Sequence, residues 1–339
     1  MSTPSPCRTS PDPQIGAAAE LLPRLLPAGR VVVVSDAAID RLHPSLVAPY
    51  EKILIGQGET IKTLRTVEQI HRRLIELGAD RRTFVLGVGG GIVTDVTGFA
   101  AATYMRGVPF GFVSTTLLGQ IDASVGGKNG VNVSGYKNMA GTFTQPRFVV
   151  CDPALLATLP PREFRAGLAE AVKAAVIGDR ALFERLEAAS FEALRSDGAL
   201  LAEVIGAAIR VKTRIVARDE REAGERRLLN LGHTLAHAIE KCSQAMNHGE
   251  AVAVGLRLMA EASVRLGLLP PEEAARIVGL LERLGFVLTP PVPLARLLRE
   301  VGKDKKSEGT SLHAVLPLGI GRCEVRTVEK TQFAAWFPK

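Results

Sequence analysis

Two apolar runs, each followed by polar or glycine residues, constrain the fold of this chain more than any other feature. Residues 30–36 read RVVVVSD, and residues 83–88 read TFVLGV, which three successive glycines follow. Continuous runs of this kind are typical of strands that are buried on both faces of a parallel sheet. A short strand at 53–55, a helix at about 64–77 and another helix after the glycines complete the pattern. This order predicts a doubly wound, Rossmann-like α/β domain.

The glycine-rich turn after the strand at 83–88, GVGGGIVTDVTG, has two interpretations. Because Gly89, Gly90 and Gly91 have no side chains, a pyrophosphate could approach their backbone amides at the positive end of the helix. The third glycine of the GxGxxG fingerprint is missing, however, and glycines also occur where a helix simply packs tightly on a sheet. Asp36, at the end of its strand, is either an acceptor for ribose hydroxyls or an exposed loop acid.

The stretch GQIDASVGGKNGVNVSGYKNMAGTF, residues 119–143, predicts a long functional loop because it is rich in Gly, Asn, Ser and Lys. Within and near it, Arg106, Lys128, Lys137 and Asn138 could together hold phosphate and carboxylate groups. Asp122 beside them could accept a substrate hydroxyl. Taken alone, each lysine would more often be part of the solvated surface.

From residue 152 onward the pattern changes to successive helices, including one at 162–177, which continue to about residue 299. We therefore place a domain boundary near residue 155. The predicted organisation is a disordered, proline-rich leader at 1–15, a nucleotide-binding α/β domain at 16–155 and a metal-binding domain at 156–339. The last domain is expected to be helical throughout, except for a short β-hairpin around residues 318–321.

Three of the six histidines lie close together in this helical half. His233 and His237 are four residues apart on one predicted helix, so their imidazoles project from about the same face. His248 begins the next helix. Two histidines brought together by a turn, plus a carboxylate, can form a three-ligand site for a divalent metal with room for substrate. Glu170 is a natural third ligand, and Lys173 lies on the same helical face.

Simpler explanations remain for the same residues: histidines near helix ends can be caps, and Glu170 with Lys173 can be a structural salt bridge. The density of neighbouring polar groups favours a polar pocket between helices; these groups are Arg226, Asn230, Glu240, Asn247 and Glu250. No HExxH pattern is present, so the sequence does not indicate a metalloprotease.

Composition excludes other classes of function. The formal net charge is +7, but the basic residues occur in short pairs without interleaved aromatics, and aromatics make up only 5% of the chain. This favours an anionic small-molecule substrate over nucleic acid. The longest apolar stretches are interrupted by Asp95, Arg257 and Glu261, so no membrane span is expected. The four cysteines are scattered without a CxxC pair, which is typical of a reducing cytoplasm.

Several distinct motifs occur in the order found in one known family. They are GGGIVTDVTGF, RGVPFGFVSTTLLGQIDASVGGKNGVN, KNMAGTF, LPPREFRAGLAEAVK, LLNLGHTLAHAIE, NHGEAVAVG and DKK. Over roughly residues 50 to 310 the chain resembles the 3-dehydroquinate synthases of the sugar phosphate cyclase superfamily. The sequence departs from the usual family pattern at four positions, none of which removes a charged group: Ser114, Asn129, Leu231 and Ala236.

The resemblance implies conversion of 3-deoxy-D-arabino-heptulosonate 7-phosphate to 3-dehydroquinate and phosphate in the shikimate pathway. The implied reaction uses transient oxidation by NAD, β-elimination of phosphate, re-reduction, ring opening and an intramolecular aldol closure. It also implies a divalent metal, zinc or cobalt, and a homodimer in which Arg106 reaches across the interface.

By motif match, the expected metal ligands are Glu170, His233 and His248. The positions expected around the substrate are Asp122, Lys128, Asn138, Lys173, Lys212, Arg226, Asn230, His237 and Lys305, with Arg106 from a partner subunit. The positions expected to bind NAD are Glu59, Lys62, Gly90, Gly91, Asp95, Thr115, Thr116, Lys137 and Thr158, in addition to Asp36 and Gly89.

Three alternatives remain. Related cyclases make aminodehydroquinate, 2-deoxy-scyllo-inosose or 2-epi-5-epi-valiolone, and the first of these activities is the hardest to distinguish by sequence. A metal-dependent alcohol dehydrogenase of the glycerol dehydrogenase type would share the architecture but would not need Lys128, Lys173, Lys212 and Arg226. A catalytically inactive scaffold would have no reason to keep so many charges in one cleft.

Overall fold

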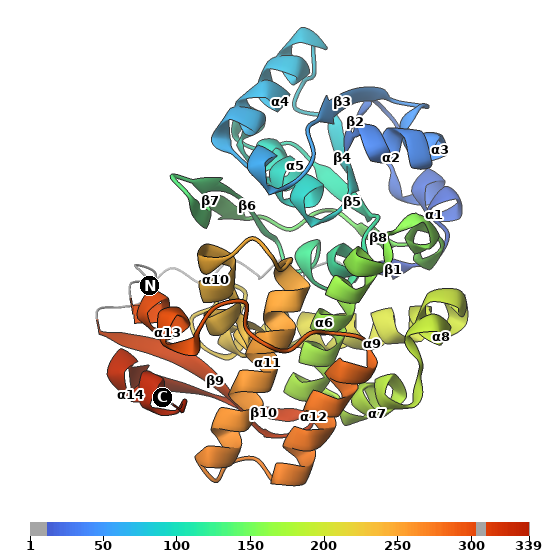
Figure 1. Ribbon diagram of the computed structural model, residues 1–339. Helices are drawn as coiled ribbons and strands as arrows, with labels where there is room; N and C mark the ends of the chain where they lie inside the picture. Colours follow the sequence, from blue (N-terminus) through green and yellow to red (C-terminus); the bar gives the residue numbers. More distant parts are fainter. Residues whose placement is uncertain (1–11, 303–309, 339) are drawn as a thin grey trace, which may run out of the picture. The chain divides into compact units, whose positions relative to one another are not determined.

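The computed structural model describes residues 12–302 and 310–338 (Figure 1). The chain divides into two compact units between Leu159 and Pro160, whereas the sequence pattern placed a boundary near residue 155. Of the expected leader at 1–15, residues 1–11 lie outside the described part, and Gln14–Ile15 form the short strand β1.

The first unit is built on a six-stranded parallel sheet with the strand order β1-β8-β5-β4-β2-β3. Its strands are β1, β2 (Val31–Asp36), β3 (Glu51–Ile55), β4 (Phe84–Gly89), β5 (Phe110–Ser114) and β8 (Val149–Cys151). The two apolar runs are β2 and β4 and lie side by side, with Val34 paired to Gly87. The expected α/β sheet is therefore confirmed.

Helices cover both faces of this sheet, with α4 and α5 on one face and α1, α2 and α3 on the other (Figure 1). Their bounds are α1 (Ala18–Leu25), α2 (Ala37–Leu42), α3 (Pro44–Val47), α4 (Leu64–Glu76) and α5 (Gly91–Thr103). Shorter helical turns are η1 (Glu59–Ile61), η2 (Tyr104–Arg106), η3 (Gly119–Ala123) and η4 (Pro153–Thr158). Because β2 is covered on both sides, all four of its valines are buried.

The expected long loop at 119–143 is instead ordered as η3 and a β-hairpin. Strands β6 (Lys128–Val133) and β7 (Tyr136–Phe143) pair in antiparallel fashion. The two connecting residues, Ser134 and Gly135, have φ angles of 51° and 78°. Positive φ at both turn positions matches the twist of a two-residue hairpin, which explains how this polar, glycine-rich stretch forms strands.

The second unit is mainly helical and includes a β-hairpin, which helix α14 follows. Its elements are α6 (Pro161–Gly178), α7 (Arg180–Ala188), α8 (Phe191–Ser196), α9 (Gly198–Arg218), η5 (Glu225–Asn230), α10 (His233–Cys242), α11 (His248–Arg265), α12 (Pro271–Arg283), α13 (Leu294–Gly302), β9 (Ser311–Gly319), β10 (Arg322–Glu329) and α14 (Lys330–Ala335). Strands β9 and β10 pair in antiparallel fashion and turn at residues 320–321, within the hairpin expected from the sequence. Across the described ranges, no helix is both long and apolar enough to span a membrane.

Candidate metal and nucleotide sites

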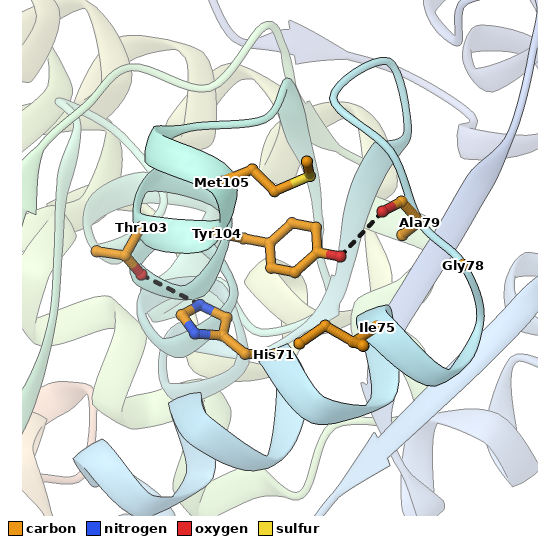
Figure 2. A pocket seen from close by; sticks show the side chains of 7 residues that line it. All are labelled: His71, Ile75, Gly78, Ala79, Thr103, Tyr104 and Met105. Carbon is orange, nitrogen blue, oxygen red and sulfur yellow. Dashed lines mark hydrogen bonds between the residues drawn. The ribbon is translucent and has the colours of Figure 1, made fainter.

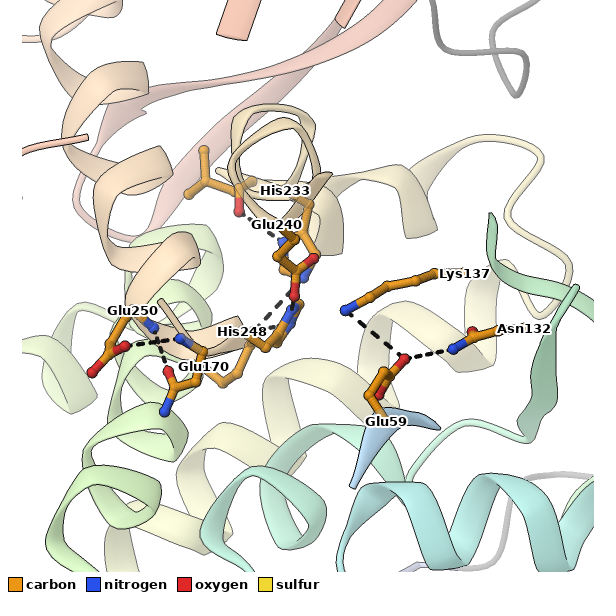
Figure 3. Close-up of polar contacts among 10 residues, drawn as sticks. Glu59, Asn132, Lys137, Glu170, His233, Glu240, His248 and Glu250 are labelled. Atoms are coloured by element: carbon orange, nitrogen blue, oxygen red, sulfur yellow. Dashed lines mark hydrogen bonds and ion pairs between the residues drawn. The ribbon is translucent and has the colours of Figure 1, made fainter. Parts of the chain in front are cut away.

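The structure brings together the three metal ligands that the sequence predicts. Glu170 lies in the middle of α6, and His233 and His248 are the first residues of α10 and α11. Glu170 Oε1 lies 3.6 Å from His233 Nε2 and 3.4 Å from His248 Nε2 (Figure 3). One ligand atom from each residue falls within 4.8 Å of the others. Two imidazoles and one carboxylate are a donor set that suits zinc or cobalt and leaves coordination positions for substrate.

Glycines allow the three helices to approach closely enough for this cluster to form. A Cβ added at Gly249 would lie 2.2 Å from the backbone oxygen of Ala166 on α6. A Cβ at Gly255 would lie 2.1 Å from the backbone oxygen of Gly232, which precedes α10. Since neither position tolerates a side chain, α11 lies directly on the backbones of both neighbours.

The electrostatic surroundings of the two histidines differ. Glu170 forms a buried ion pair with Lys173. Burial, together with the positive charge of Lys173, lowers the pKa of His233 to about 3. Burial alone would also lower the pKa of His248, but hydrogen bonds to Glu170 and Glu240 outweigh it and raise that pKa to about 9. His233 is therefore already neutral at pH 7, as a metal ligand must be, whereas a metal would displace a proton from His248.

Glu240 contacts the second ring nitrogen of His248. Its Oε1 lies 3.2 Å from His248 Nδ1, and the Glu240 side chain is only 8% exposed. A carboxylate that accepts a hydrogen bond from Nδ1–H fixes the tautomer in which Nε2 carries the lone pair and can bind a metal. The sequence singled out Glu240 only as one of several polar neighbours and did not indicate this contact.

Three cations expected around the substrate are buried in this unit: Lys173, Lys212 and Arg226 are 3%, 8% and 2% exposed. They lie on α6, α9 and η5, and these three elements pack against one another. Buried cations favour an anionic ligand. His237 presents its ring edge-on to His233, with centroids 5.6 Å apart, and Asn230 donates its side-chain amide to Glu222.

In the first unit, the expected nucleotide site lies at the N-terminus of α5. Gly90 is the N-cap of this helix, no side chain caps it, and its first turn contains no acidic residue. Buried Thr115 Oγ1 has no hydrogen-bond partner among the described residues. These features suit an anion held by backbone amides. The glycines also permit tight packing, since a Cβ at Gly90 would lie 2.9 Å from Thr116 Cγ2, so both interpretations of the turn remain valid.

Four of the charged residues expected at NAD form pairs with their neighbours. Lys62 is buried and forms an ion pair with Asp95 on α5. Glu59 accepts a hydrogen bond from Asn132 Nδ2 at 2.7 Å and lies 3.9 Å from Lys137 Nζ (Figure 3). Asn132, on β6, was not among the residues that the sequence indicated.

Three more of these residues hydrogen bond within the fold. Asp36 Oδ1 accepts hydrogen bonds from the amides of Ala38 and Ile39 and so caps α2. This is a structural role, in addition to the NAD-binding role that was expected. Thr116 Oγ1 accepts from the Gly119 amide, and Thr158 Oγ1 lies 3.0 Å from His43 Nε2 and donates to a backbone carbonyl.

The remaining expected substrate residues lie in the first unit or outside the described part. Asp122 is in η3, and Lys128 is the exposed first residue of β6. Arg106 and Asn138 both have left-handed backbones, with φ of 68° and 52°; such conformations in residues other than glycine are concentrated at functional sites. Lys305 lies outside the described residues.

Comparison with solved structures shows which class of protein has this fold. The fold matches 2-epi-5-epi-valiolone synthase from Streptomyces hygroscopicus subsp. jinggangensis, a structure with NAD+ and Zn2+ bound, with a TM-score of 0.88 and 29% identity over 99% of this chain and 98% of that one. It also matches 2-deoxy-scyllo-inosose synthase complexed with carbaglucose-6-phosphate, NAD+ and Co2+, with a TM-score of 0.84 and 27% identity over 95% of each chain. The fold is thus that of the sugar phosphate cyclases.

Sequence comparison then identifies the family. Family models described as 3-dehydroquinate synthase N-terminal and C-terminal match residues 52–166 and 167–307. The 3-dehydroquinate synthase of Halorhodospira halophila is 46% identical over 303 residues, covering 87% of this chain and 86% of that protein. This chain belongs to the 3-dehydroquinate synthase family.

Proposed function

We propose that the protein is a 3-dehydroquinate synthase that converts 3-deoxy-D-arabino-heptulosonate 7-phosphate to 3-dehydroquinate and phosphate. The observation that carries this proposal is the Glu170, His233 and His248 cluster beside buried Lys173, in a chain related to dehydroquinate synthases through both of its units. Identity to such relatives reaches 46%, against 27% and 29% for the two cyclases that make other carbocycles. This difference favours dehydroquinate as the product.

NAD and a divalent metal fit the residues described above. When bound, NAD would exchange a hydride with a secondary alcohol, and zinc or cobalt would polarise its oxygen as a Lewis acid. Glu170, His233 and His248 would hold the metal. The amides at Gly90 and Gly91, the hydroxyl of Thr115 and the polar residues of the first unit would hold the nucleotide.

The chain itself would supply positioning and charge. Buried Lys173, Lys212 and Arg226 would bind the anionic groups of the substrate, with Lys128, Asn138 and Lys305 as further contacts from other segments. Asp122, Asn230 and His237 would hydrogen bond to its hydroxyls. Held charges fix the geometry of a multistep reaction, so we expect these residues to affect turnover as well as binding.

The test measures phosphate release from the heptulosonate phosphate, with the product identified by mass, in the presence and absence of NAD and of a chelator. Glu170→Ala and His248→Ala should abolish both bound metal and turnover. Glu282→Ala, an exposed carboxylate on α12, should change neither. Full turnover by a metal-free variant would refute the metal's role. A product mass corresponding to aminodehydroquinate or another carbocycle would replace the substrate assignment.

We also propose a homodimer in which Arg106 completes the partner's site. This is supported by the strained, exposed turn that carries Arg106: Met105 precedes it with φ of 48° and is 42% exposed. Met105, Tyr104 and Ile75 line a surface hollow of about 490 Å³ that a partner could fill (Figure 2). Light scattering measures the oligomeric state directly.

Mixing two inactive variants tests whether the site is shared. Arg106→Ala and Lys173→Met should each be inactive alone. After subunit exchange the equimolar mixture should recover about a quarter of wild-type activity, because about half of the dimers are mixed and each of these has one intact site of two. No recovery after subunit exchange would show that Arg106 acts within its own chain.

The compartment that we propose is the reducing cytoplasm. Cys151, Cys242 and Cys323 are free thiols in the structure. Burial raises the pKa of Cys323 to about 12 and raises that of Cys151 further. Cys151 and Cys323 are therefore protonated at neutral pH and unreactive. Fractionation of cells that express the tagged chain measures its location.

A further inference from the structure

A buried asparagine closes the base of the β6–β7 hairpin, next to a lysine that is expected at the substrate. Asn129 is 6% exposed and follows Lys128, the exposed first residue of β6. It is one of the four positions at which the sequence departs from the usual family pattern. We propose that Asn129 is a positioning residue that fixes the backbone around Lys128. The inference rests on the proposed function, since Lys128 is assigned to the substrate only through that proposal.

The side-chain amide of Asn129 joins the chain before β6 to the chain after β7. Its Nδ2 donates hydrogen bonds to the backbone carbonyls of Gly127, at 3.0 Å, and Thr144, at 2.9 Å. The Gly127 carbonyl also accepts from the Thr144 amide at 2.9 Å. Because carbonyls only accept hydrogen bonds, the two contacts decide that the NH2 group of Asn129 faces them. The amide therefore holds the two ends of the hairpin together.

The same side chain packs on the backbone of α5, which lies beside β6 (Figure 1). A Cβ added at Gly98 of α5 would lie 1.9 Å from Asn129 Oδ1 and 3.1 Å from Asn129 Cβ. With Nδ2 turned to the two carbonyls, Oδ1 faces this helix. Asn129 thus fixes the base of the hairpin relative to α5, whose N-terminus is the candidate nucleotide site.

The segment before Lys128 has little conformational preference of its own. Gly126 and Gly127 have φ angles of 96° and 70°, and glycine adopts positive values about as readily as negative ones. A lysine that follows two glycines is poorly fixed unless other groups hold their backbone. The Asn129 amide holds the Gly127 carbonyl immediately before Lys128. A charge that must meet an anionic substrate in one geometry gains from this restraint.

Substitutions at Asn129 and Gly98 separate positioning from packing. Asn129→Ala removes the amide, and Asn129→Thr keeps one hydroxyl that can donate to one of the two carbonyls. Gly98→Ala keeps Asn129 but places a methyl group where its Oδ1 lies. When Gly98→Ala is combined with Asn129→Ala, the clash with Oδ1 is removed while the amide stays absent. Thr142→Val is the matched control, because Thr142 pairs with Asn129 across the hairpin and its Oγ1 has no hydrogen-bond partner among the described residues.

Melting temperature, kcat and KM for phosphate release are measured for each variant. We expect Asn129→Ala to lose about 10- to 100-fold in kcat/KM, since a misplacement of about 1 Å can cost about 100-fold. Asn129→Thr should fall between this variant and wild type, and Thr142→Val should match wild type. Gly98→Ala should lose both activity and melting temperature. The combined variant should melt above Gly98→Ala and yet stay as inactive as Asn129→Ala.

A second background tests whether the effect passes through Lys128. Lys128→Met removes the charge that is positioned and should lower kcat/KM by itself. In this background Asn129→Ala should cost nothing further, because it acts through the missing ammonium group. A purely structural role of Asn129 would give the same loss in both backgrounds.

Three results would overturn the inference: wild-type kcat/KM in Asn129→Ala, return of activity together with melting temperature in the combined variant, or a loss that is additive with Lys128→Met. If the wild-type protein releases no phosphate, the proposed function fails instead. Crystal structures of the wild type and of Asn129→Ala then test the positioning by itself. An unmoved, fully ordered Lys128 main chain in the variant refutes it, and a displaced or disordered one supports it.

Discussion

Removing the carboxylate of Glu240 should weaken metal binding without touching a ligand. His248 presents Nε2 to Glu170 at 3.4 Å and Nδ1 to Glu240 at 3.2 Å. In Glu240→Ala the ring loses its partner on the far side from the metal and can rotate or change tautomer. Loss of such a contact typically costs about 10- to 100-fold in metal affinity, or about 1.4 to 2.8 kcal/mol.

Loss of Glu240 also has an effect that favours metal binding, and the size of this effect depends on pH. Glu240 helps to raise the pKa of His248 to about 9 in the metal-free protein. Below that pH a proton competes with the metal by about tenfold per pH unit. Glu240→Ala lowers this pKa and so reduces the competition. The difference in affinity between variant and wild type should therefore be largest at or above pH 9 and smaller at pH 7.

Competition with a chelator of known affinity measures cobalt or zinc binding at both pH values. Glu240→Gln, which keeps an acceptor oxygen without the charge, should give an intermediate value, and Glu282→Ala should bind as wild type. Unfolding of the metal-free proteins is followed in parallel, so that a folding defect is recognised. Wild-type affinity at pH 9 in a folded Glu240→Ala protein would refute the reasoning.

Two further predictions concern packing and pH. Gly249→Ala should lower stability by about 1 to 3 kcal/mol and weaken metal binding, because the added Cβ would lie 2.2 Å from the Ala166 backbone oxygen. Gly198→Ala, where the added Cβ meets open space, should change neither stability nor metal binding. The same chelator and melting assays measure both variants. The hydrogen bonds from Arg276 lower the pKa of Glu187, so this pair stabilises the fold above the usual carboxyl pKa and the effect is lost as pH falls through the folded value. Arg276→Met should therefore cost about 0.5 to 1 kcal/mol at pH 7, and the difference should shrink below about pH 4.5 in pH-dependent melting; a gap that stays constant down to pH 3 would contradict this assignment.

Strands β2, β3 and β4 of the first unit and most helices of the second could be predicted because their signals are local. The valines of β2 and the run before Gly89 show burial on both faces of a sheet in the sequence itself. The hairpin of β6 and β7 was missed because its signal is a backbone conformation. Ser134 and Gly135 take up left-handed φ values only when the flanking strands pair.

The candidate ligands Glu170, His233 and His248 could be named from the sequence because imidazoles and carboxylates bind divalent metals, although helix caps and a salt bridge were simpler explanations for the same residues. The supporting contacts could not be named. Glu240 meets His248 only because α10 and α11 fold back on each other, and Gly249 matters only because α6 lies against it. The sequence alone determined which side chains can bind a metal or an anion. The tertiary structure decided which neighbours orient them, because contacts between distant segments depend on helix packing and leave no periodic pattern in the chain.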